Sequence, residues 1–466
     1  MRNYLPKQYA VALWATLAVC LGGSVAAQPP YEVFFNYAVA GLEDAIDVAY
    51  TGDAFSAAAV RLVDEATATV DLAAYNFDHA PLASALRRAH DRGVRVRVVT
   101  DEDTSHPSLI SPTPNYFWLA VNEEGLMHHK FLVADAAVPG QEAVLTGSTN
   151  FTDANIYRFD NDALLLRSPE LAAAYAEEMD LLWGGTTAVP NGSRSRSGSA
   201  KPRRQIRSFR AGELRGELYF SPSDGIEDRI ATLIDSAQQT VAMQLLLITD
   251  DELGARLAAA DARGVDVFGV VENFDSPSSE YAFLRSRGVD LEAHRPDDIV
   301  HHKYGVFDPE RGAEAVVVTG SHNWTYSART FHDENSLVLR GSALLTELYY
   351  EAARQQHCAL VADAADCRSR LTSSSTDLPV APADLSVGPN PSRGRLTVAL
   401  SGGTAELRGL RIYDSTGRPV YGAPLTMVRG ARRELDLSHL PAQTYYLQVA
   451  TAADGWTRPR AFQITP

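Results

Sequence analysis

A pattern of polar residues occurs twice in this chain, and the second copy follows the first at a distance of 173 positions. Each copy reads His-x-Lys-x4-Asp and is followed by Gly-Ser-x-Asn and then by a polar triplet. The first copy consists of His128, Lys130, Asp135, Gly147, Ser148, Asn150 and the triplet Asp160-Asn161-Asp162. The second consists of His301, Lys303, Asp308, Gly320, Ser321, Asn323 and the triplet Asp333-Glu334-Asn335. The same order and spacing in both copies indicate an internal repeat of two similar lobes.

Short apolar runs surround both copies and predict how the polar residues are held. These runs, which read as buried strands, are residues 131–133, 144–145, 304–307 and 316–318. Side chains alternate along a strand, so His128 and Lys130 should project from one face while His129 points to the other. The glycine of each Gly-Ser-x-Asn lets the next strand end in a tight turn. Each half is therefore predicted to present an imidazole, an ammonium and a carboxamide at neighbouring strand ends.

Two such clusters that face one another suit a phosphate diester. Ammonium and amide groups would bind the phosphate oxygens, one imidazole would attack phosphorus, and the other would protonate the leaving oxygen. The ammonium groups of Lys130 and Lys303 would repel a divalent cation, so we expect neither a metal nor any other cofactor.

These motifs resemble the paired His-Lys-Asp motifs of the phospholipase D superfamily, and the resemblance covers roughly residues 30–360. It implies a two-lobed α/β fold, with a mixed sheet flanked by helices in each lobe and an active site between the lobes. It also implies a phosphohistidine intermediate, with His128 and His301 catalytic and His128 as the nucleophile. The residues that it assigns to phosphate binding are Lys130, Lys303, Asn150, Asn323, Ser148 and Ser321, while Asp135 and Asp308 complete the motif.

The two halves differ at the residue that would orient a catalytic histidine. Glu334 matches the acidic residue of the family, but its equivalent in the first half is Asn161, and we assign both to the catalytic set. Either an adjacent aspartate substitutes in the first half, or His128 has a neutral partner. A neutral partner would stabilise the imidazolium less and would lower the pKa of His128 relative to that of His301.

Helical and apolar segments alternate in the second half, which predicts βαβ units and a largely parallel or mixed sheet in each lobe. The expected elements are a helix over 226–234, a strand over 241–248, a helix over 251–262 and a strand over 265–271. Residues 75–77 and 246–248 lie at matching strand ends, where we interpret them mainly as core residues.

Residues 1–27 have the composition of a secretory signal peptide, with basic residues, an apolar run over 10–21 and Val-Ala-Ala at 25–27. The run is short for a membrane span, so we favour cleavage over a membrane anchor. Export permits disulfides, and the closely spaced Cys358 and Cys367 predict one; two free thiols are the alternative.

Two polar stretches mark boundaries further along the chain. Residues 190–212 are rich in Ser, Gly and Arg and predict a flexible basic linker, which either solubilises the chain or contacts phosphates or anionic lipid. Residues 371–383 are rich in Ser, Thr and Pro and predict a second linker. The expected division is a signal peptide (1–27), lobe 1 (28–189), a linker (190–212), lobe 2 (213–370), a linker (371–383) and a C-terminal domain (384–466).

The C-terminal domain reads as all-β, with short strands separated by turn signals. Residues 388–394, 410–418, 435–440 and 445–447 resemble the C-terminal sorting domain of type IX secretion substrates, although residues 442–444 stand where the family usually has a glycine. The resemblance implies a β-sandwich, the type IX machinery as a partner, and delivery to the cell surface or the medium. The alternative is an ordinary adhesive β-sandwich.

Charge and motifs together favour one function over two others. The formal net charge is −16, which disfavours nonspecific nucleic-acid binding because such binding relies on basic surface. We therefore expect a secreted phospholipase D that hydrolyses phospholipid headgroups to phosphatidic acid, as a monomer with both motifs in one chain. One alternative is a secreted nonspecific endonuclease, which the basic stretch 190–212 would favour. The other is a surface protein that binds phosphodiesters without catalysis, which Asn161 would favour.

Overall fold

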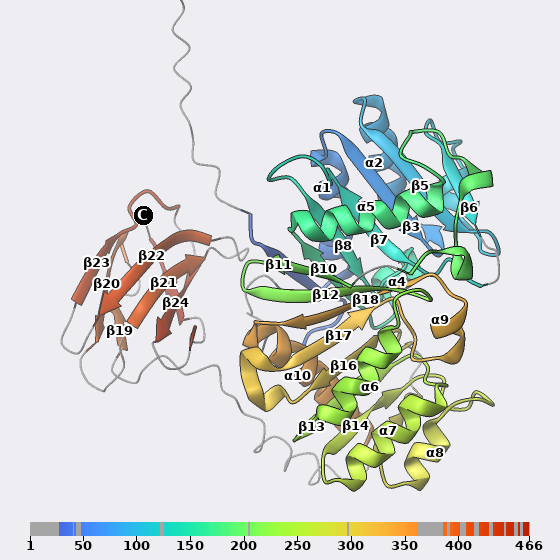
Figure 1. The fold of residues 1–466 in the computed structure, drawn as a ribbon. Coiled ribbons are helices and arrows are strands. Elements are labelled where there is room, and N and C mark those ends of the chain that lie inside the picture. Colours follow the sequence, from blue (N-terminus) through green and yellow to red (C-terminus); the bar gives the residue numbers. More distant parts are fainter. Residues whose placement is uncertain are drawn as a thin grey trace, which may run out of the picture.

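The computed structural model is shown in Figure 1. It describes residues 28–361, except 41, 43–47, 122–124, 204–205 and 296–297, and in the tail 385–388, 392–400, 407–413, 419–427, 432–441, 444–451, 455–456 and 460–465. The expected signal peptide, the linker 371–383 and Cys367 lie outside the described residues, although Cys358 is disulfide-bonded. Among the described residues, no helix is both long and apolar enough to cross a membrane.

The first lobe is built on an eight-stranded sheet in the order β2-β1-β10-β8-β7-β3-β5-β6. Strands β3, β5 and β6 are parallel, whereas β7, β8 and β10 are antiparallel to their neighbours, so the sheet is mixed. Its elements are β1 (Tyr31–Phe35), β2 (Val48–Ala49), α1 (Gly52–Glu65), β3 (Thr69–Ala74), β4 (Phe77–Asp78), α2 (Ala80–Asp91), β5 (Arg95–Asp101), α3 (Pro107–Ile110), β6 (Trp118–Val121), β7 (Lys130–Ala134), β8 (Ala143–Gly147), β9 (Phe151–Thr152), α4 (Asp153–Tyr157), β10 (Asp162–Leu166) and α5 (Pro169–Trp183).

The second lobe repeats this arrangement in a sheet of order β11-β12-β18-β17-β16-β13-β14-β15. Strands β16, β17 and β18 occupy the places of β7, β8 and β10, which confirms the tandem mixed-sheet fold expected from the repeat. Its elements are η1 (Gly192–Arg194), η2 (Gly198–Ala200), β11 (Arg207–Ala211), β12 (Leu214–Ser221), α6 (Ile226–Ser236), β13 (Thr240–Leu245), α7 (Asp251–Ala262), β14 (Asp266–Val271), α8 (Tyr281–Ser286), β15 (Asp290–Ala293), β16 (Lys303–Phe307), η3 (Pro309–Glu314), β17 (Val316–Gly320), α9 (Tyr326–Thr330), β18 (Glu334–Arg340) and α10 (Ala343–Leu360).

Residues 190–212 were expected to be a flexible linker, but the parts of this segment that the structure describes are folded against the lobes. Residues 207–211 form the edge strand β11, which pairs with β12 through a two-residue turn in which Gly212 has a φ of 62°. Positive φ is easily adopted by glycine, so the hairpin closes at this point. Earlier in the segment, Ser195, Ser197 and Lys201 are buried. The basic stretch is therefore part of the packed fold between the lobes.

One apolar core is shared by the two lobes. It contains Tyr175 and Trp183 of α5 together with Phe220 of β12 and Tyr349 of α10. The rings of Tyr175 and Phe220 cross between the lobes with centroids 5.2 Å apart. Burial of each such side chain contributes about 1.5–3 kcal/mol, so this core holds the two halves of the site in a fixed relation. Separate cores lie under α1 and α2 in the first lobe and under α6 and α7 in the second.

The tail forms two small antiparallel sheets, β19-β20-β23 and β22-β21-β24-β25, with β26 paired to β24. Both sheets contribute to one apolar core, including Val398 and Ile412, as expected for a β-sandwich. The strands are β19 (Leu385–Gly388), β20 (Arg395–Leu400), β21 (Leu407–Tyr413), β22 (Pro419–Met427), β23 (Arg432–Asp436), β24 (Thr444–Thr451), β25 (Gly455–Trp456) and β26 (Arg460–Gln463).

Candidate active site

The two motifs meet between the lobes through backbone hydrogen bonds that cross from one lobe to the other. The N–H of His128 donates to the carbonyl of Asp333 at 2.9 Å, and the N–H of Asp333 donates to the carbonyl of Leu126 at 2.8 Å. The second half repeats this pairing, because the N–H of His301 donates to the carbonyl of Asp160 at 2.8 Å. Each His-x-Lys segment is thus anchored to the polar triplet of the opposite lobe.

The imidazole partners also cross between lobes. Nδ1 of His128 bonds to Oε2 of Glu334 at 2.8 Å, and Nδ1 of His301 bonds to Oδ1 of Asn161 at 2.8 Å. The expectation that His128 has the neutral partner is therefore wrong, and His301 has it instead. The physical reason is that the backbone of each triplet is hydrogen-bonded to the His-x-Lys segment of the opposite lobe.

Neither aspartate beside Asn161 substitutes for the missing glutamate. Asp162 binds Nδ1 of His302 at 2.8 Å, and Asp160 accepts a hydrogen bond from Gln356 at 2.7 Å. The side chains of His129 and His302 thus take partners different from those of His128 and His301, as the strand alternation predicted.

The hydrogen bonds of Asn161 fix the tautomer of its histidine. Nδ2 of Asn161 donates to the carbonyls of Asn155 and Phe159 at 3.0 and 3.2 Å, so Oδ1 faces His301 as an acceptor. Nδ1 of His301 must then carry a proton, which leaves Nε2 with a lone pair. The same argument holds for His128, whose Nδ1 faces a carboxylate. Both Nε2 atoms are therefore able to attack or to take up a proton.

Burial controls the charge of the site. It lowers the pKa of His128 to about 3, although Glu334 works in the opposite direction. Burial also lowers the pKa of His301 well below its usual range, and its carboxamide partner opposes that shift far less than a carboxylate does. Burial disfavours the Glu334 charge, but His128 and Lys130 outweigh it and lower the pKa of Glu334 to about 2. The free site thus holds neutral imidazoles beside an ionised glutamate.

Each lysine donates to the backbone of the histidine of its own motif and has hydrogen-bonding capacity to spare. Nζ of Lys130 donates to the carbonyl of His128 at 2.8 Å, and Nζ of Lys303 donates to that of His301 at 2.5 Å. An ammonium has three N–H groups, so each lysine retains donors for an anion. Burial lowers the pKa of Lys130 to about 7 and that of Lys303 well below its usual range, and repulsion by Lys130 adds to the latter. A bound phosphate would relieve this repulsion and raise both values.

The residues of the Gly-Ser-x-Asn motifs take several roles. A Cβ on Gly147 would lie 2.3 Å from the carbonyl oxygen of Asp162, so only glycine permits this approach of β8 to β10. Ser148 is fully buried and donates to Oδ1 of Asn161 at 3.0 Å, and Ser321 accepts from the N–H of Asn335 at 2.9 Å. Both hydroxyls thus support the triplets behind the histidines, and their assignment to phosphate binding stays a prediction.

The two motif asparagines stay candidates for phosphate binding, because a carboxamide can donate N–H groups to phosphate oxygens. Oδ1 of Asn150 and Oδ1 of Asn323, which can only accept, are buried without a hydrogen-bond partner among the described residues. Nδ2 of Asn150 donates to Oδ1 of Asn155 at 3.2 Å. Asn323 is partly exposed, so its amide can reorient toward a ligand.

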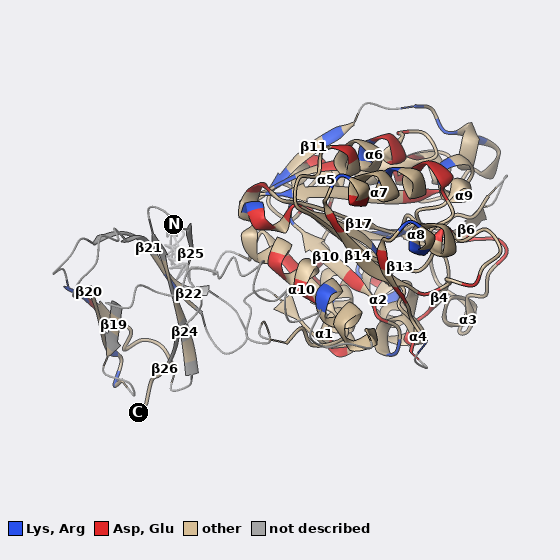
Figure 2. Cartoon of the chain, turned by 90° about the horizontal axis from the view of Figure 1, so that it is seen from below, with Lys and Arg blue, Asp and Glu red and all other residues tan. Residues whose placement is uncertain are grey.

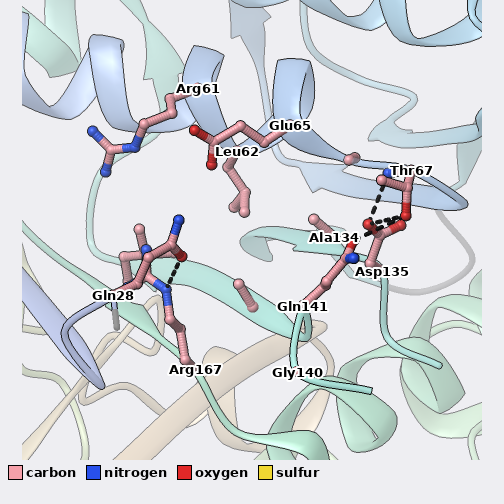
Figure 3. Close-up of a pocket in the computed structure, with 13 residues that line it drawn as sticks. Gln28, Arg61, Leu62, Glu65, Thr67, Ala134, Asp135, Gly140, Gln141 and Arg167 are labelled. Carbon is pink, nitrogen blue, oxygen red and sulfur yellow. Dashed lines mark hydrogen bonds between the residues drawn. The ribbon is translucent and has the colours of Figure 1, made fainter. Parts of the chain in front are cut away.

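The motif aspartates stabilise turns far from the histidines. Asp135 ends β7 with a φ of 50° and accepts from the N–H groups of Thr67, Ala68 and Thr69 at 2.7 to 2.9 Å. Asp308 does the same for residues 238–240. Asp135 also lines a cavity of about 570 Å³ beside Arg61 and Arg167 (Figure 3). That cavity lies at the opposite end of β7 from Lys130, so it is separate from the catalytic groups.

Three aromatic residues beside the histidines were not assigned to the site from the sequence. The rings of Tyr75 and His128 have centroids 4.6 Å apart, so this strand-end residue flanks the site rather than only filling the core. The ring centroids of His332 and His128 are 6.5 Å apart, and those of Phe159 and His301 are 6.3 Å apart. Phe159 and His332 are separated by the repeat distance of 173 positions, which is the signal that would have found them.

Two neutral imidazoles, two buried lysines and one ionised glutamate define a site for transfer of a phosphodiester phosphorus. The chain belongs to the family described as "cardiolipin synthase, PLD-like domain", whose model matches residues 59–183 and 230–355, more than half of the chain. A model described as "secretion system C-terminal sorting domain" matches residues 386–459, which confirms the interpretation of the tail.

Individual relatives match a length that corresponds to one lobe. The mitochondrial cardiolipin hydrolase of Xenopus laevis is 36% identical over 139 residues, which is 29% of this chain and 63% of that protein. The phospholipase D of Rickettsia conorii is 28% identical over 145 residues, which is 30% of this chain and 70% of that protein. Among solved structures, the phosphatidylserine synthase of Haemophilus influenzae has the same fold, with a TM-score of 0.50 and 13% identity over 74% of this chain and 93% of that one.

Proposed function

We propose that this protein is an exported phospholipase D that hydrolyses the headgroup ester of phospholipids through a phosphohistidine on His128. The observation that carries the proposal is the pair of imidazoles whose partners at Nδ1 leave a lone pair on Nε2, together with two buried lysines. Glu334 favours His128 as the nucleophile, because attack on phosphorus turns the ring into a cation that a carboxylate stabilises. His301, opposite a neutral carboxamide, forms the less stable imidazolium and so the stronger acid.

The proposed reaction has two balanced steps. First, Nε2 of His128 bonds to phosphorus while the bond to the headgroup oxygen breaks, and His301 gives its Nε2 proton to that oxygen. The neutral His301 then takes a proton from water as the water oxygen attacks phosphorus, which breaks the bond to His128 and releases phosphatidic acid. The remaining donors of Lys130 and Lys303 bind the phosphate oxygens throughout. The anionic substrate also raises the pKa of His301, so that His301 holds a proton when it is needed.

Phospholipid is the substrate class that we favour, and two arguments support it. The relatives named above are described as acting on lipids: a cardiolipin hydrolase and a phospholipase D. The charge of the chain is unfavourable for nucleic acid, and Lys201 of the basic stretch is buried rather than offered to phosphates. Figure 2 shows basic residues at β11 beside acidic residues of neighbouring helices, and Arg207 of this strand pairs with Glu177 of α5.

The substrate is tested by assaying one protein preparation on vesicles of phosphatidylcholine or cardiolipin and on single- and double-stranded DNA. We expect headgroup release from lipid, and we expect its loss in both His128→Ala and His301→Ala. Cleavage of DNA alone would show the endonuclease alternative, and binding of either without turnover would show the non-catalytic alternative. Substantial activity in both histidine variants would contradict the two-histidine mechanism.

We further propose that the sorting domain directs export through the type IX machinery, so that the catalytic lobes act outside the cell. The match of the tail to a sorting-domain model supports this proposal. A chain that ends near residue 374 should retain its activity but remain in the periplasm of the native host. Normal surface delivery of that shortened chain would refute the role of the tail.

A further inference from the structure

The segment that precedes β11 places a buried lysine close to the active site. The side chain of Lys201 has no exposed surface, and its ammonium donates to Oε1 of Glu178 at 2.7 Å and to the carbonyl of Ser221 at 2.8 Å. It also lies 2.6 Å from Oδ1 of Asp333. All three N–H groups are thus used, which is what a buried ammonium requires.

These contacts connect both lobes to the support of His128. Glu178 belongs to α5 of the first lobe and also binds Nε2 of His129 at 2.9 Å. Asp333 belongs to the second lobe, and its carbonyl accepts the backbone N–H of His128 at 2.9 Å. The next residue, Glu334, holds the imidazole of His128 at 2.8 Å. The ammonium therefore fixes the same short stretch of chain that orients the proposed nucleophile.

The cluster around Lys201 has the composition of a metal site. His129, Glu178 and Asp333 each offer a ligand atom, and these atoms all lie within 4.8 Å of one another. Such a set of imidazole and carboxylate ligands is suited to a divalent cation such as zinc. The ammonium binds two of the three residues and so takes the place of that cation.

The two halves of the repeat explain why a cation is needed on one side only. The His128 side holds three buried carboxylates, those of Glu178, Asp333 and Glu334, whereas the His301 side holds the buried Asp162 and the partly exposed Asp160. On that side Asp160 is held by the neutral side chain of Gln356 at 2.7 Å. Buried carboxylates without a counter-charge are costly, so the additional negative charge requires Lys201.

We propose that Lys201 is a positioning residue for His128, serving as the fixed cation of the buried cluster formed by His129, Glu178 and Asp333. This inference rests on the proposed function, because it assumes that His128 is the nucleophile. Loss of the ammonium leaves two carboxylates that repel one another and releases the start of β18. A displacement of the catalytic group by about 1 Å costs about a hundredfold in rate.

The kinetic test compares Lys201→Met with Arg196→Met on an aryl phosphodiester. Arg196 lies in the same segment but is exposed, and its guanidinium donates to the carbonyl of Ser195, so its removal controls for loss of a nearby charge. We expect Lys201→Met to lower kcat by about a hundredfold with little change in KM, and Arg196→Met to match the unaltered protein. An unaltered kcat in Lys201→Met would overturn the proposal.

A double variant separates positioning from folding. Lys201→Met combined with Glu178→Gln removes one charge of each sign, so the cluster keeps its net charge. We expect the melting temperature to recover in this variant while kcat remains low, because Asp333 is still unsupported. Recovery of both quantities would assign Lys201 a purely structural role and overturn the proposal.

A zinc measurement reports on the cluster without any activity. Lys201→Ala opens the cation position, so this variant should retain about one zinc per chain after desalting, whereas the unaltered protein should retain none there. Adding Asp333→Ala should abolish the retained zinc. If Lys201→Ala retains no zinc, the ammonium does not occupy a cation site. If the unaltered protein hydrolyses no phosphodiester, the proposed function fails, while zinc retention still decides the assignment of Lys201.

Discussion

Replacement of Glu334 by glutamine tests which histidine is the nucleophile. The substitution keeps the shape and an acceptor for Nδ1 of His128 but removes the negative charge at 2.8 Å. A hydrogen bond to a charged group contributes about 1.5–3 kcal/mol, against about 0.5–1.5 kcal/mol for a neutral one. The developing imidazolium also loses its buried counter-charge. We therefore expect a loss of about 2–3 kcal/mol of transition-state stabilisation, or about 30- to 160-fold in the rate of adduct formation.

The assay uses two phosphodiesters that differ in their leaving group. An aryl diester releases an acidic phenol that leaves without help, whereas an alkyl diester requires a proton from the general acid. Glu334→Gln should slow both substrates to a similar extent, because it impairs the attack on phosphorus. His301→Ala should impair the alkyl diester far more than the aryl diester. If Glu334→Gln instead spares the aryl diester and His301→Ala abolishes its cleavage, then His301 is the nucleophile and His128 the general acid. That result would refute the assignment made above.

Four further predictions concern charge, turns, partitioning and metal ions. The pKa of Lys130 is lowered to about 7, so its positive charge is present below that pH and lost above it. We therefore expect kcat/KM to fall as the pH rises above about 7, and we expect Lys130→Arg to move this fall to higher pH. If the fall in kcat/KM stays at the same pH in Lys130→Arg, the prediction is wrong. Asp135→Ala and Asp308→Ala should each lower the free energy of unfolding by about 1.5–3 kcal/mol in denaturant titrations, because each removes a carboxylate that accepts backbone N–H groups. The turnover per folded molecule should stay unaltered. A loss of turnover without a loss of stability would contradict their role in stabilising turns. Ethanol added to a phosphatidylcholine assay should yield phosphatidylethanol, and the absence of this product would contradict a covalent intermediate. Activity should survive dialysis against a chelator. A loss of activity that a divalent ion restores would contradict the site as described.

The repeat of 173 positions predicted most of what the structure shows at the level of elements. Apolar runs beside the motifs became β7, β8, β16 and β17, and the helices expected over 226–234 and 251–262 became α6 and α7. Agreement was good because each of these segments has a strong apolar periodicity that tertiary packing reinforces. The strand expected over 241–248 ends earlier, at Leu245, although the N–H of Leu246 still donates to the carbonyl of His302.

The sequence was less informative about contacts between the lobes. Spacing shows that Asn161 and Glu334 are equivalent, but it does not show that each side chain reaches the histidine of the opposite lobe. The same limit applies to Lys201, whose neighbours in sequence are typical of a solvated linker while its partners lie on three distant elements. The sequence likewise assigns Ser148 to phosphate binding but does not show that its hydroxyl bonds to Asn161 and Asp162 behind the histidine of the other lobe.

The most direct test of the mechanism is to trap the intermediate and locate its phosphorus. The protein is mixed with a labelled phosphodiester, quenched within one turnover in base, digested and mapped by mass spectrometry, with a parallel sample treated with acid. The account predicts a phosphorylated imidazole at His128 that is stable in base and labile in acid, formed in the unaltered protein and absent in His128→Ala. Turnover with no adduct at any histidine, or an adduct at His301 alone, would contradict it.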